Sequence, residues 1–389
     1  MFAVFQAARK AIAPLAAFLS LIALAACEPT PFGGPSINTS APVPVALLVP
    51  SGSENTGDDL LAQSLENAAR LAISDLDGVN IDLRVYATAG DPAQARAMAV
   101  EAVRDGAKII LGPVYGESAN AAAVAVASRG VNVLSFSNNT TIAGGNLFIL
   151  GPTFQNTADR LVSFAGSQGK GRIVVAHDTG VAGQLGRNSI ASAVSRSPET
   201  TLVSAVPYER SQQGVIEAIP MIRDEVQNGA DSVFLTALTE GALPLLTQLL
   251  DESGVDPETT QYIGLTRWDI PPQTLELPSV QGGWFALPDP TMTQRFSSRY
   301  TAAFGTAPHA IGGLSYDGIA AIGALVNAGH SDALTAGALT QSAGFQGVNG
   351  IFRMHRDGTN ERGLAVAQIQ NKQVVVIDPA PRSFAGPGF

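Results

Sequence analysis

The stretch at 107–118, with the sequence AKIILGPVYGES, restricts the folds open to this chain more than any other. A short apolar run there stops at Gly112-Pro113, and an alanine-rich segment follows at 119–128. Such a run is typical of a buried parallel strand, and the alanine-rich segment predicts a helix. The pattern repeats at once, because an apolar strand at 131–135 leads into the polar loop FSNNTT. Two neighbouring strands therefore end in polar loops at one edge of a predicted parallel sheet, where open α/β sheets bind ligands.

Strand and helix patterns alternate through most of the chain, in two series. The strands are expected at 43–49, 81–86, 109–111, 131–135 and 146–150, and then at 171–176, 202–206, 231–236, 261–265 and 282–287. Helical patterns separate them, among them 58–75, 92–105, 157–167, 183–195, 215–228 and 241–252. Strands that alternate with helices predict parallel three-layer sheets, here two of them. The end of the chain differs, with helices at 293–304, 311–328 and 333–341 and a hairpin pattern at 350–376 that turns at 356–359.

The composition argues against several classes of protein. Hydrophobic residues make up 46% of the 389 residues and charged residues 14%, which is typical of a globular chain. The formal net charge of −10 comes without any cluster of Lys or Arg, so we expect no nucleic-acid partner. The four histidines lack metal-ligand spacing, and no His-Glu-x-x-His or Gly-x-Ser-x-Gly motif occurs. We therefore expect no enzyme, no catalytic residue, no metal site and no cofactor.

Near its start the sequence has the features of an export signal. Arg9 and Lys10 precede an apolar segment that is short for a membrane span and ends in LAAC at Cys27, the only cysteine. This ending resembles the lipobox of bacterial lipoproteins, in which lipidation of the cysteine provides a membrane anchor. The alternative is an ordinary signal peptide with an incidental cysteine. We expect 1–27 to be a lipoprotein signal peptide and 28–42, which is rich in Pro, Gly and Ser, to be a flexible tether.

Five segments carry a resemblance to a known family: PVALLVPS at 44–51, GPVYGES at 112–118, SFSNN at 135–139, SYDG at 315–318 and FQGVNGIF at 345–352. They resemble the leucine/isoleucine/valine-binding proteins, which have the type I periplasmic binding fold. The resemblance implies two Rossmann-like α/β lobes joined by three crossovers, with a ligand cleft between them. The implied N-terminal lobe consists of 43–152 and 288–340, and the C-terminal lobe of 153–287 and 341–389.

A closer resemblance is to the C-terminal domain of outer-membrane lipoproteins that activate class A penicillin-binding proteins. It is carried by YATAGDPAQA at 86–95, IILGP at 109–113 and NLFILGP at 146–152, together with the lipobox. It implies a lipid-anchored periplasmic regulator of peptidoglycan synthesis that binds a class A penicillin-binding protein. The alternative is a substrate-binding lipoprotein for amino acids or amides, either the receptor of an ABC permease or a sensor. Glu28 replaces the aspartate that retains enteric lipoproteins in the inner membrane, which favours the outer membrane.

The wider resemblance also implies where an amino-acid-like or muropeptide ligand would bind. In the amino-acid binders of this family, two loops of the first lobe hold the carboxylate and the ammonium of the ligand. The matching residues here, with a serine that follows the first strand, are Ser51, Tyr115, Gly116, Glu117, Ser118, Ser137, Asn138, Asn139 and Thr140. The facing lobe would contribute His177, Asp178, Thr239, Glu240 and Trp268. Alternatively, the serines and asparagines only cap helices and fill turns.

Individual residues favour different functions or environments. Glu117 would repel a ligand carboxylate, which ranks the amino-acid receptor second. Trp268 follows a strand end, so the cleft, a partner surface and the core are all open to it. Trp284 lies within an apolar run, and the aromatic residues of 293–304 are spaced four apart. Both patterns predict core packing.

Overall fold

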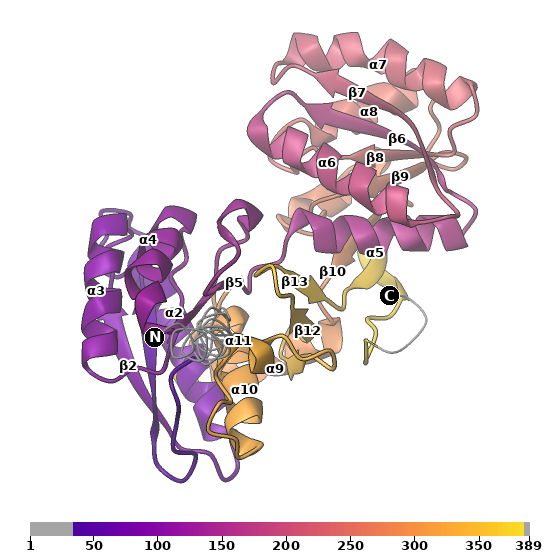
Figure 1. Cartoon of the computed structure of the whole chain (residues 1–389). Coiled ribbons are helices and arrows are strands. Elements are labelled where there is room, and N and C mark those ends of the chain that lie inside the picture. Colours follow the sequence, from indigo (N-terminus) through magenta and orange to yellow (C-terminus); the bar gives the residue numbers. More distant parts are fainter. Residues whose placement is uncertain (1–33, 385–389) are drawn as a thin grey trace, which may run out of the picture.

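The computed structural model describes residues 34–384. The predicted signal peptide, with Cys27, and the first part of the tether lie outside the described residues. The described chain forms two lobes, each built around a β-sheet flanked by helices and joined at one side (Figure 1). The prediction of two Rossmann-like α/β lobes is confirmed. Within 34–384, no helix combines the length and the apolar character that a membrane span needs.

The sheet of the first lobe has five parallel strands in the order β2-β1-β3-β4-β5. They are β1 (Val43–Val49), β2 (Ile81–Ala87), β3 (Ile109–Leu111), β4 (Asn132–Ser135) and β5 (Leu147–Ile149). One face is covered by α2 (Asp58–Ser74) and α10 (Gly313–Asn327), and the other by α3 (Pro92–Arg104) and α4 (Gly116–Val126). Successive side chains of β1 alternate between the two faces, so that Leu47 and Leu48 belong to different cores. Burial on both faces explains why these strands are apolar runs.

The sheet of the second lobe has seven strands in the order β15-β14-β10-β9-β8-β6-β7. They are β6 (Arg172–Asp178), β7 (Thr201–Tyr208), β8 (Ser232–Leu235), β9 (Gln261–Gly264), β10 (Trp284–Leu287), β14 (Ala365–Gln370) and β15 (Gln373–Asp378). One face is covered by α5 (Phe154–Ser167) and α6 (Val181–Arg196), and the other by α7 (Gln212–Gln227) and α8 (Leu243–Glu252). Trp284 is buried in this lobe, which confirms its prediction as a core residue.

The remaining helices are short or belong to the first lobe. Helix α9 (Pro290–Phe304) packs on α2, and Phe296 and Tyr300 are buried in that contact, as their spacing predicts. The others are α11 (Ala336–Leu339) and the 3-10 helices η1 (Ala127–Arg129), η2 (Thr140–Ile142), η3 (Pro272–Glu276) and η4 (Pro278–Val280).

The C-terminal segment divides between the lobes. Strands β11 (Phe345–Gly347), β12 (Gly350–Met354) and β13 (Asn360–Arg362) form a small antiparallel sheet, and Phe345 and Phe352 pack in the core of the first lobe. Strands β14 and β15 form a separate hairpin within the second sheet. The turn predicted at 356–359 therefore joins β12 to β13 and not to β14. Of 341–389, which the sequence assigned to the C-terminal lobe, the described part before β14 packs on the first lobe because its aromatic side chains complete that core.

Three crossovers join the lobes, as predicted, and they lie between β5 and α5, between β10 and α9, and between β13 and β14. The first crossover is bonded to β13, where the third begins, because Arg362 Nε donates to the carbonyl of Leu150 at 3.0 Å and Asn360 Nδ2 donates to the carbonyl of Gly151 at 2.9 Å. The buried carboxylate of Asp317, on α10, pairs with Arg362 Nη1 at 3.0 Å. The junction of the lobes is thus fixed to the first lobe by buried hydrogen bonds.

Candidate functional site

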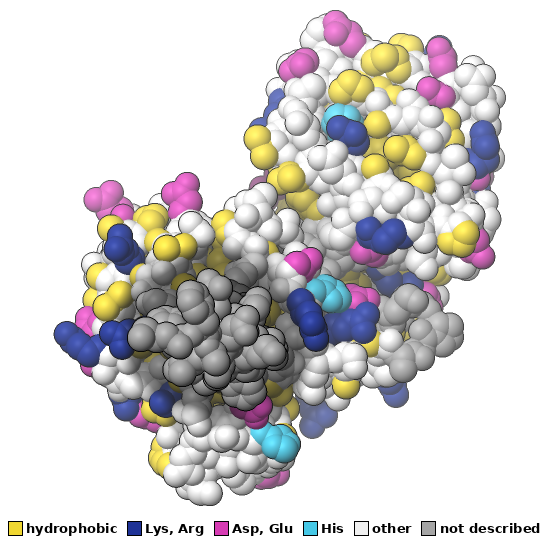
Figure 2. Space-filling view, viewed as in Figure 1, with side chains coloured by type: hydrophobic (Ala, Val, Ile, Leu, Met, Phe, Trp, Pro, Cys, Tyr) yellow, Lys and Arg dark blue, Asp and Glu magenta, His cyan; other side chains and the backbone are white. Residues whose placement is uncertain are grey.

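The carboxyl ends of the parallel strands in both lobes border the space between the lobes (Figure 1). In the first lobe this edge is formed by the segments that follow β1 to β4, and in the second lobe by those that follow β6 to β9. Figure 2 shows the surface hollowed between the lobes, with hydrophobic side chains on both sides of the hollow. This is the edge at which open α/β sheets bind ligands.

The two loops singled out in the first lobe lie side by side. A Cβ atom built on Gly116 would lie 3.2 Å from Asn139 Nδ2 and 3.6 Å from Ser137 Oγ. The loop after β3 therefore touches the loop after β4, as parallel neighbours in the sheet require. Glu117, Asn138 and Thr140 are exposed at this edge.

Most hydrogen-bonding groups of these loops are engaged within the protein. Ser118 is buried, and its hydroxyl donates to the carbonyl of Gly90 at 3.2 Å. The Ser137 hydroxyl accepts from the backbone N–H of Asn139 at 3.1 Å, and Asn139 Oδ1 accepts from the N–H of Thr141 at 3.0 Å. These contacts are those of residues that cap helices and shape turns. The structure therefore favours the structural alternative for Ser118, Ser137 and Asn139.

Tyr115 connects this edge to the start of α2. Its hydroxyl donates to Asp58 Oδ1 at 2.6 Å, while 37% of the tyrosine remains exposed. The hydrogen bond to the carboxylate, followed by burial, raises the pKa of the Tyr115 phenol. Ser51 is half-buried nearby, and its carbonyl accepts from the N–H of Ala89 at 3.1 Å.

On the second lobe, His177 and Asp178 end strand β6. His177 is 7% exposed and its Nδ1 lies 3.0 Å from the carbonyl of Asp178, so the ring is part of the strand end and not of an open surface. The Asp178 carboxylate accepts from the N–H of Gly180 at 2.9 Å and lies 3.8 Å from Arg210 Nε. Asp178 and Arg210 line a cavity of about 430 Å³ at this edge, together with Tyr208.

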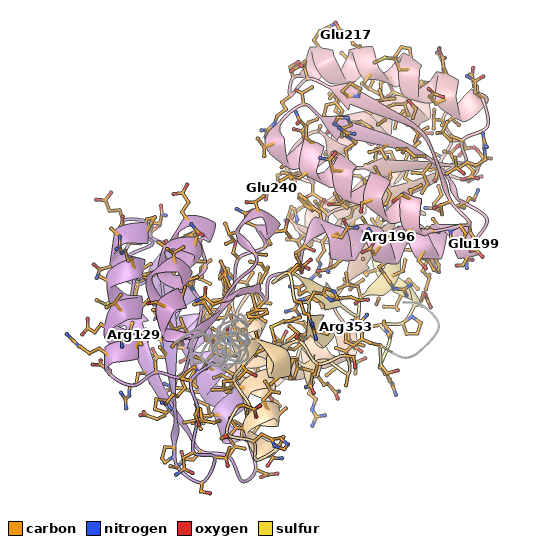
Figure 3. The ribbon with its side chains drawn as sticks, viewed as in Figure 1. Arg129, Arg196, Glu199, Glu217, Glu240 and Arg353 are labelled. Atoms are coloured by element: carbon orange, nitrogen blue, oxygen red, sulfur yellow. The ribbon has the colours of Figure 1, made fainter. Side chains whose placement is uncertain are left out.

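The other three candidates of the second lobe have different surroundings. Thr239 donates its hydroxyl to the carbonyl of Ile270 at 2.7 Å, which joins the loops after β8 and β9. Glu240 is exposed and lies on the side of this lobe that faces the first (Figure 3). Trp268 is fully buried in the core of the second lobe, so its place among the residues that line the cleft is wrong. Its ring fills the space that Gly264 and Gly283 leave by having no side chain.

A second cavity, of about 270 Å³, lies where the three crossovers meet. Residues of all three crossovers line it, among them Thr153, Pro288 and Leu364. Arg267 of the second lobe and Asn349 of the first add polar groups. Arg267 is part of the segment TRW that follows β9, but its position at the junction depends on crossovers that are far apart in the sequence. Sequence reasoning therefore missed this cavity.

The walls of the cavity at the crossovers are mainly apolar. Its apolar residues include Leu265, Ile270, Leu287, Ile311 and Leu314. The Arg267 guanidinium pairs with Asp269, with Nε 2.9 Å from Oδ1, and 37% of the arginine side chain remains exposed. The cavity can therefore enclose an apolar group and offers it a partly neutralised cation.

Exposed apolar side chains gather at the same two edges. Eleven large hydrophobic residues of the described chain are exposed, and five lie at the carboxyl ends of the strands or in the first turns of the helices that follow. These five are Leu60, Tyr115, Val181, Leu238 and Ile270, with exposed fractions from 37% to 77%. These side chains are available for contact with a ligand at the two edges. Within 34–384 there is no group of three His, Cys, Asp or Glu that could hold a metal ion.

Comparisons with known proteins agree with this architecture. The family model of the periplasmic binding proteins matches residues 42–373. A structure described as a branched-chain amino acid ABC transporter from Rhodospirillum rubrum is 20% identical, covers 87% of this chain and 100% of its own, and has a TM-score of 0.72.

Two further structures are similar and contain different ligands. An ABC transporter substrate-binding protein from Desulfitobacterium hafniense, in complex with Leu, is 17% identical, with coverage of 87% and 100% and a TM-score of 0.62. An ABC transporter solute-binding protein from Rhodopseudomonas palustris, in complex with 3,4-dihydroxybenzoic acid, is 16% identical, with coverage of 87% and 96% and a TM-score of 0.57. No curated protein matches the sequence. Because the family model spans most of the sequence, including both lobes, the chain belongs to the periplasmic binding protein family.

Proposed function

We propose that this protein binds a small solute between its two lobes and serves in the periplasm as the receptor of an ABC permease. The observation that supports this role best is the cavity of about 270 Å³ at the crossovers, because both lobes and all three crossovers contribute to its lining. A solute in such a position contacts both lobes at once and can stabilise one arrangement of them. Ile270, one of the exposed apolar residues of the edges, also lines this cavity.

The lining favours a solute with an apolar body and one polar or anionic group. Apolar side chains dominate the cavity, and the exposed part of Arg267 is its accessible cation. Small pockets of this type use a few polar groups to orient a ligand that is held mainly by apolar contact. Hydrophobic amino acids and small aromatic acids satisfy this description. Similar structures hold leucine and 3,4-dihydroxybenzoic acid, one from each class.

Regulation of peptidoglycan synthesis through a class A penicillin-binding protein stays a prediction from the sequence. A regulator needs a partner surface, whereas a receptor needs a cavity lined from both lobes, and it is the second feature that is observed. Lipidation at Cys27 also stays a proposal. A lipid-anchored receptor for an inner-membrane permease should be found in the inner membrane, whereas the regulator is predicted in the outer membrane. Membrane fractionation distinguishes these two locations.

A thermal-shift screen tests the receptor role. The panel contains amino acids, small aromatic acids and muropeptides, and each hit is titrated by calorimetry. A ligand at 100 times its Kd stabilises the folded state by about 2.7 kcal/mol, which raises the Tm by several degrees. Arg267→Gln should weaken binding of any carboxylate hit about tenfold, whereas Arg223→Gln, in the exposed pair with Asp224, should not. No hit in the panel, together with recovery of a class A penicillin-binding protein in a pull-down, would reverse the order of the two roles.

A further inference from the structure

Asp58, in the first turn of α2, is buried without a full set of partners. The residue is 5% exposed, and within 34–384 its side chain makes a single hydrogen bond, which Oδ1 accepts from Tyr115. Its second oxygen, Oδ2, is buried and has no hydrogen-bond partner among the described residues. Burying a carboxylate oxygen without a hydrogen-bond partner costs free energy. Such an oxygen therefore calls for a partner from outside the chain, such as a ligand or a water molecule.

Helix capping does not explain why this carboxylate is buried. Other aspartates at helix starts accept backbone N–H groups: Asp91 accepts from Gln94 at 2.7 Å, and Asp289 accepts from Thr291 at 2.9 Å. Asp58 accepts none, and no side chain caps α2. The negative charge of Asp58 is favourable near the positive end of the helix dipole, but this interaction does not require the carboxylate to be buried.

The unpaired oxygen faces a niche built by three successive loops of the edge. A Cβ atom added to Gly90, in the loop after β2, would lie 3.5 Å from Asp58 Oδ2, 3.6 Å from Ser53 Oγ and 3.2 Å from the Tyr115 ring. Ser53 belongs to the loop after β1, and Tyr115 to the loop after β3. A carboxylate oxygen, a hydroxyl and an aromatic ring therefore surround one point, and glycine leaves that point free of a side chain.

The loops around the niche carry only negative charge. The segments 50–60, 88–95 and 112–120 contain Glu54, Asp58, Asp59, Asp91 and Glu117, and no Lys or Arg. Charge of one sign along the wall of a cleft raises the local concentration of ligands of the opposite sign. The facing loops of the second lobe differ, because they hold Arg210 and Arg267 as well as acids.

We propose that the niche formed by Ser53, Asp58, Gly90 and Tyr115 binds a protonated primary amine of the solute. This rests on the proposed receptor function and adds the charge of the ligand to it. A primary ammonium has three N–H donors, and Asp58 Oδ2 and Ser53 Oγ are acceptors for two of them. The Tyr115 ring borders the niche, with its nearest carbon 3.2 Å from the Cβ position of Gly90.

Tyr115 controls access to the niche. It is the exposed member of the group, and Asp58 Oδ2 has no contact with solvent while Tyr115 remains bonded to Oδ1. The amine reaches Oδ2 when the Tyr115 side chain rotates away from its present position. The niche is separate from Ser118, Ser137 and Asn139, whose side chains bond within the protein. Ser53 Oγ also accepts from the N–H of Asn55 at 3.1 Å, and its second lone pair remains for a ligand.

Matched ligands with and without an amine test the proposal on the full chain. The probes are leucine with 4-methylpentanoate, phenylalanine with 3-phenylpropanoate, and 2-phenylethylamine, measured by thermal shift and calorimetry. We expect a probe with an amine to bind, and its analogue without the amine to bind at least tenfold more weakly. Asp58→Asn should reduce the affinity for that probe at least tenfold. Asp224→Asn, the same change in an exposed pair on the second lobe, should alter it less than twofold.

Two more variants separate loss of the niche from loss of the fold. Ser53→Ala removes one acceptor without changing α2 and should weaken amine binding threefold to tenfold. Tyr115→Phe keeps the ring and should bind the amine at least as well as wild type. Equal binding of both members of a pair, with no effect of Asp58→Asn, would leave the receptor role intact and overturn the amine site. Failure of every amine probe, with binding of an amine-free acid from the screening panel, would overturn the amine site alone. Failure of these probes and of the whole panel would overturn the receptor role and the amine site together.

Discussion

Two buried aspartates, one at the junction of the lobes and one at the edge of the first sheet, are treated differently by the fold. Asp317 is 0% exposed and its carboxylate accepts from the N–H of Val348 at 2.8 Å, from Asn349 at 3.1 Å and from Arg362 at 3.0 Å. Asp58 is 5% exposed and accepts one hydrogen bond, from a tyrosine. Both charges lose their hydration, but only the first regains its partners within the chain.

The difference indicates what each region does. The bonds of Asp317 hold α10, the segment after β11 and the third crossover in one arrangement, so they define the frame on which the second lobe is mounted. Breaking such a pair leaves an unmatched charge in the interior. Asp58 maintains no comparable connection, and its free oxygen lies at the edge proposed to bind the solute. A buried charge that the fold leaves unpaired is therefore a better guide to a site than a buried charge alone.

Asp317→Asn should have the largest effect on stability. The substitution leaves the Arg362 guanidinium, 4% exposed, without its counter-charge, and loss of one partner of a buried pair costs about 3–5 kcal/mol. Urea unfolding followed by circular dichroism measures this loss. Asp224→Asn, which breaks an exposed pair with Arg223, is the control and should cost less than about 0.5 kcal/mol. Equal, small effects of the two variants would mean that the junction does not depend on this pair.

Gly347→Ala should act on the same network more weakly. A Cβ atom there would lie 2.0 Å from Asp317 Oδ1, and the carboxylate cannot move away without lengthening its bond to Arg362. Forcing a methyl group into such a contact costs about 1–3 kcal/mol. Gly337→Ala, at an exposed helical position with no atom nearer than 3.9 Å, should be neutral or slightly stabilising in the same unfolding experiment. If both variants lost stability, the cause would be the replacement of glycine in general and not the contact with Asp317.

The comparison also explains how far the sequence could lead. Apolar runs and helix patterns are local, so the parallel strands β1 to β10 lie close to their predicted positions, and the loops after β3 and β4 are adjacent as expected. Contacts of side chains across the fold are not local. The bond of Tyr115 to Asp58 spans 57 positions and that of Arg362 to Asp317 spans 45, and neither leaves a motif.

Trp268 shows the limit for a single residue. Its position after a strand suited the cleft, a partner surface and the core equally well. The ring turned inward because two glycines, Gly264 and Gly283, leave room for it on neighbouring strands. Those glycines are visible in the sequence, but their alignment beside Trp268 depends on the register between β9 and β10. Serines and asparagines of the loops were ambiguous for a related reason, since the same groups suit a ligand or a turn.

Asp58→Asn should change the stability of the free protein far less than Asp317→Asn, although the chemical change is the same. The amide oxygen can still accept from Tyr115, and removal of an unpaired buried charge offsets the lost charge at the start of α2. We expect the free energy of unfolding to stay within about 1 kcal/mol of wild type in urea. A loss as large as that of Asp317→Asn would assign Asp58 to the structure of the first lobe and remove the reason to regard it as held for a ligand.

The smallest effect, and the most specific to the first-lobe edge, is on the ionisation of Tyr115. The hydrogen bond to Asp58, and then burial, raises the pKa of its phenol above the ordinary value of about 10, so the bonded, protonated form stabilises the fold below that pH. This contribution is lost as the pH rises through the higher pKa of the folded state. Asp58→Asn should lower the Tyr115 pKa toward the ordinary value. Ultraviolet titration of each protein against its Tyr115→Phe counterpart isolates this phenol from the other five. If Tyr115 ionised like free tyrosine in the wild type, its hydrogen bond to Asp58 would not persist in solution. Asp58 would then be exposed to solvent rather than buried under Tyr115.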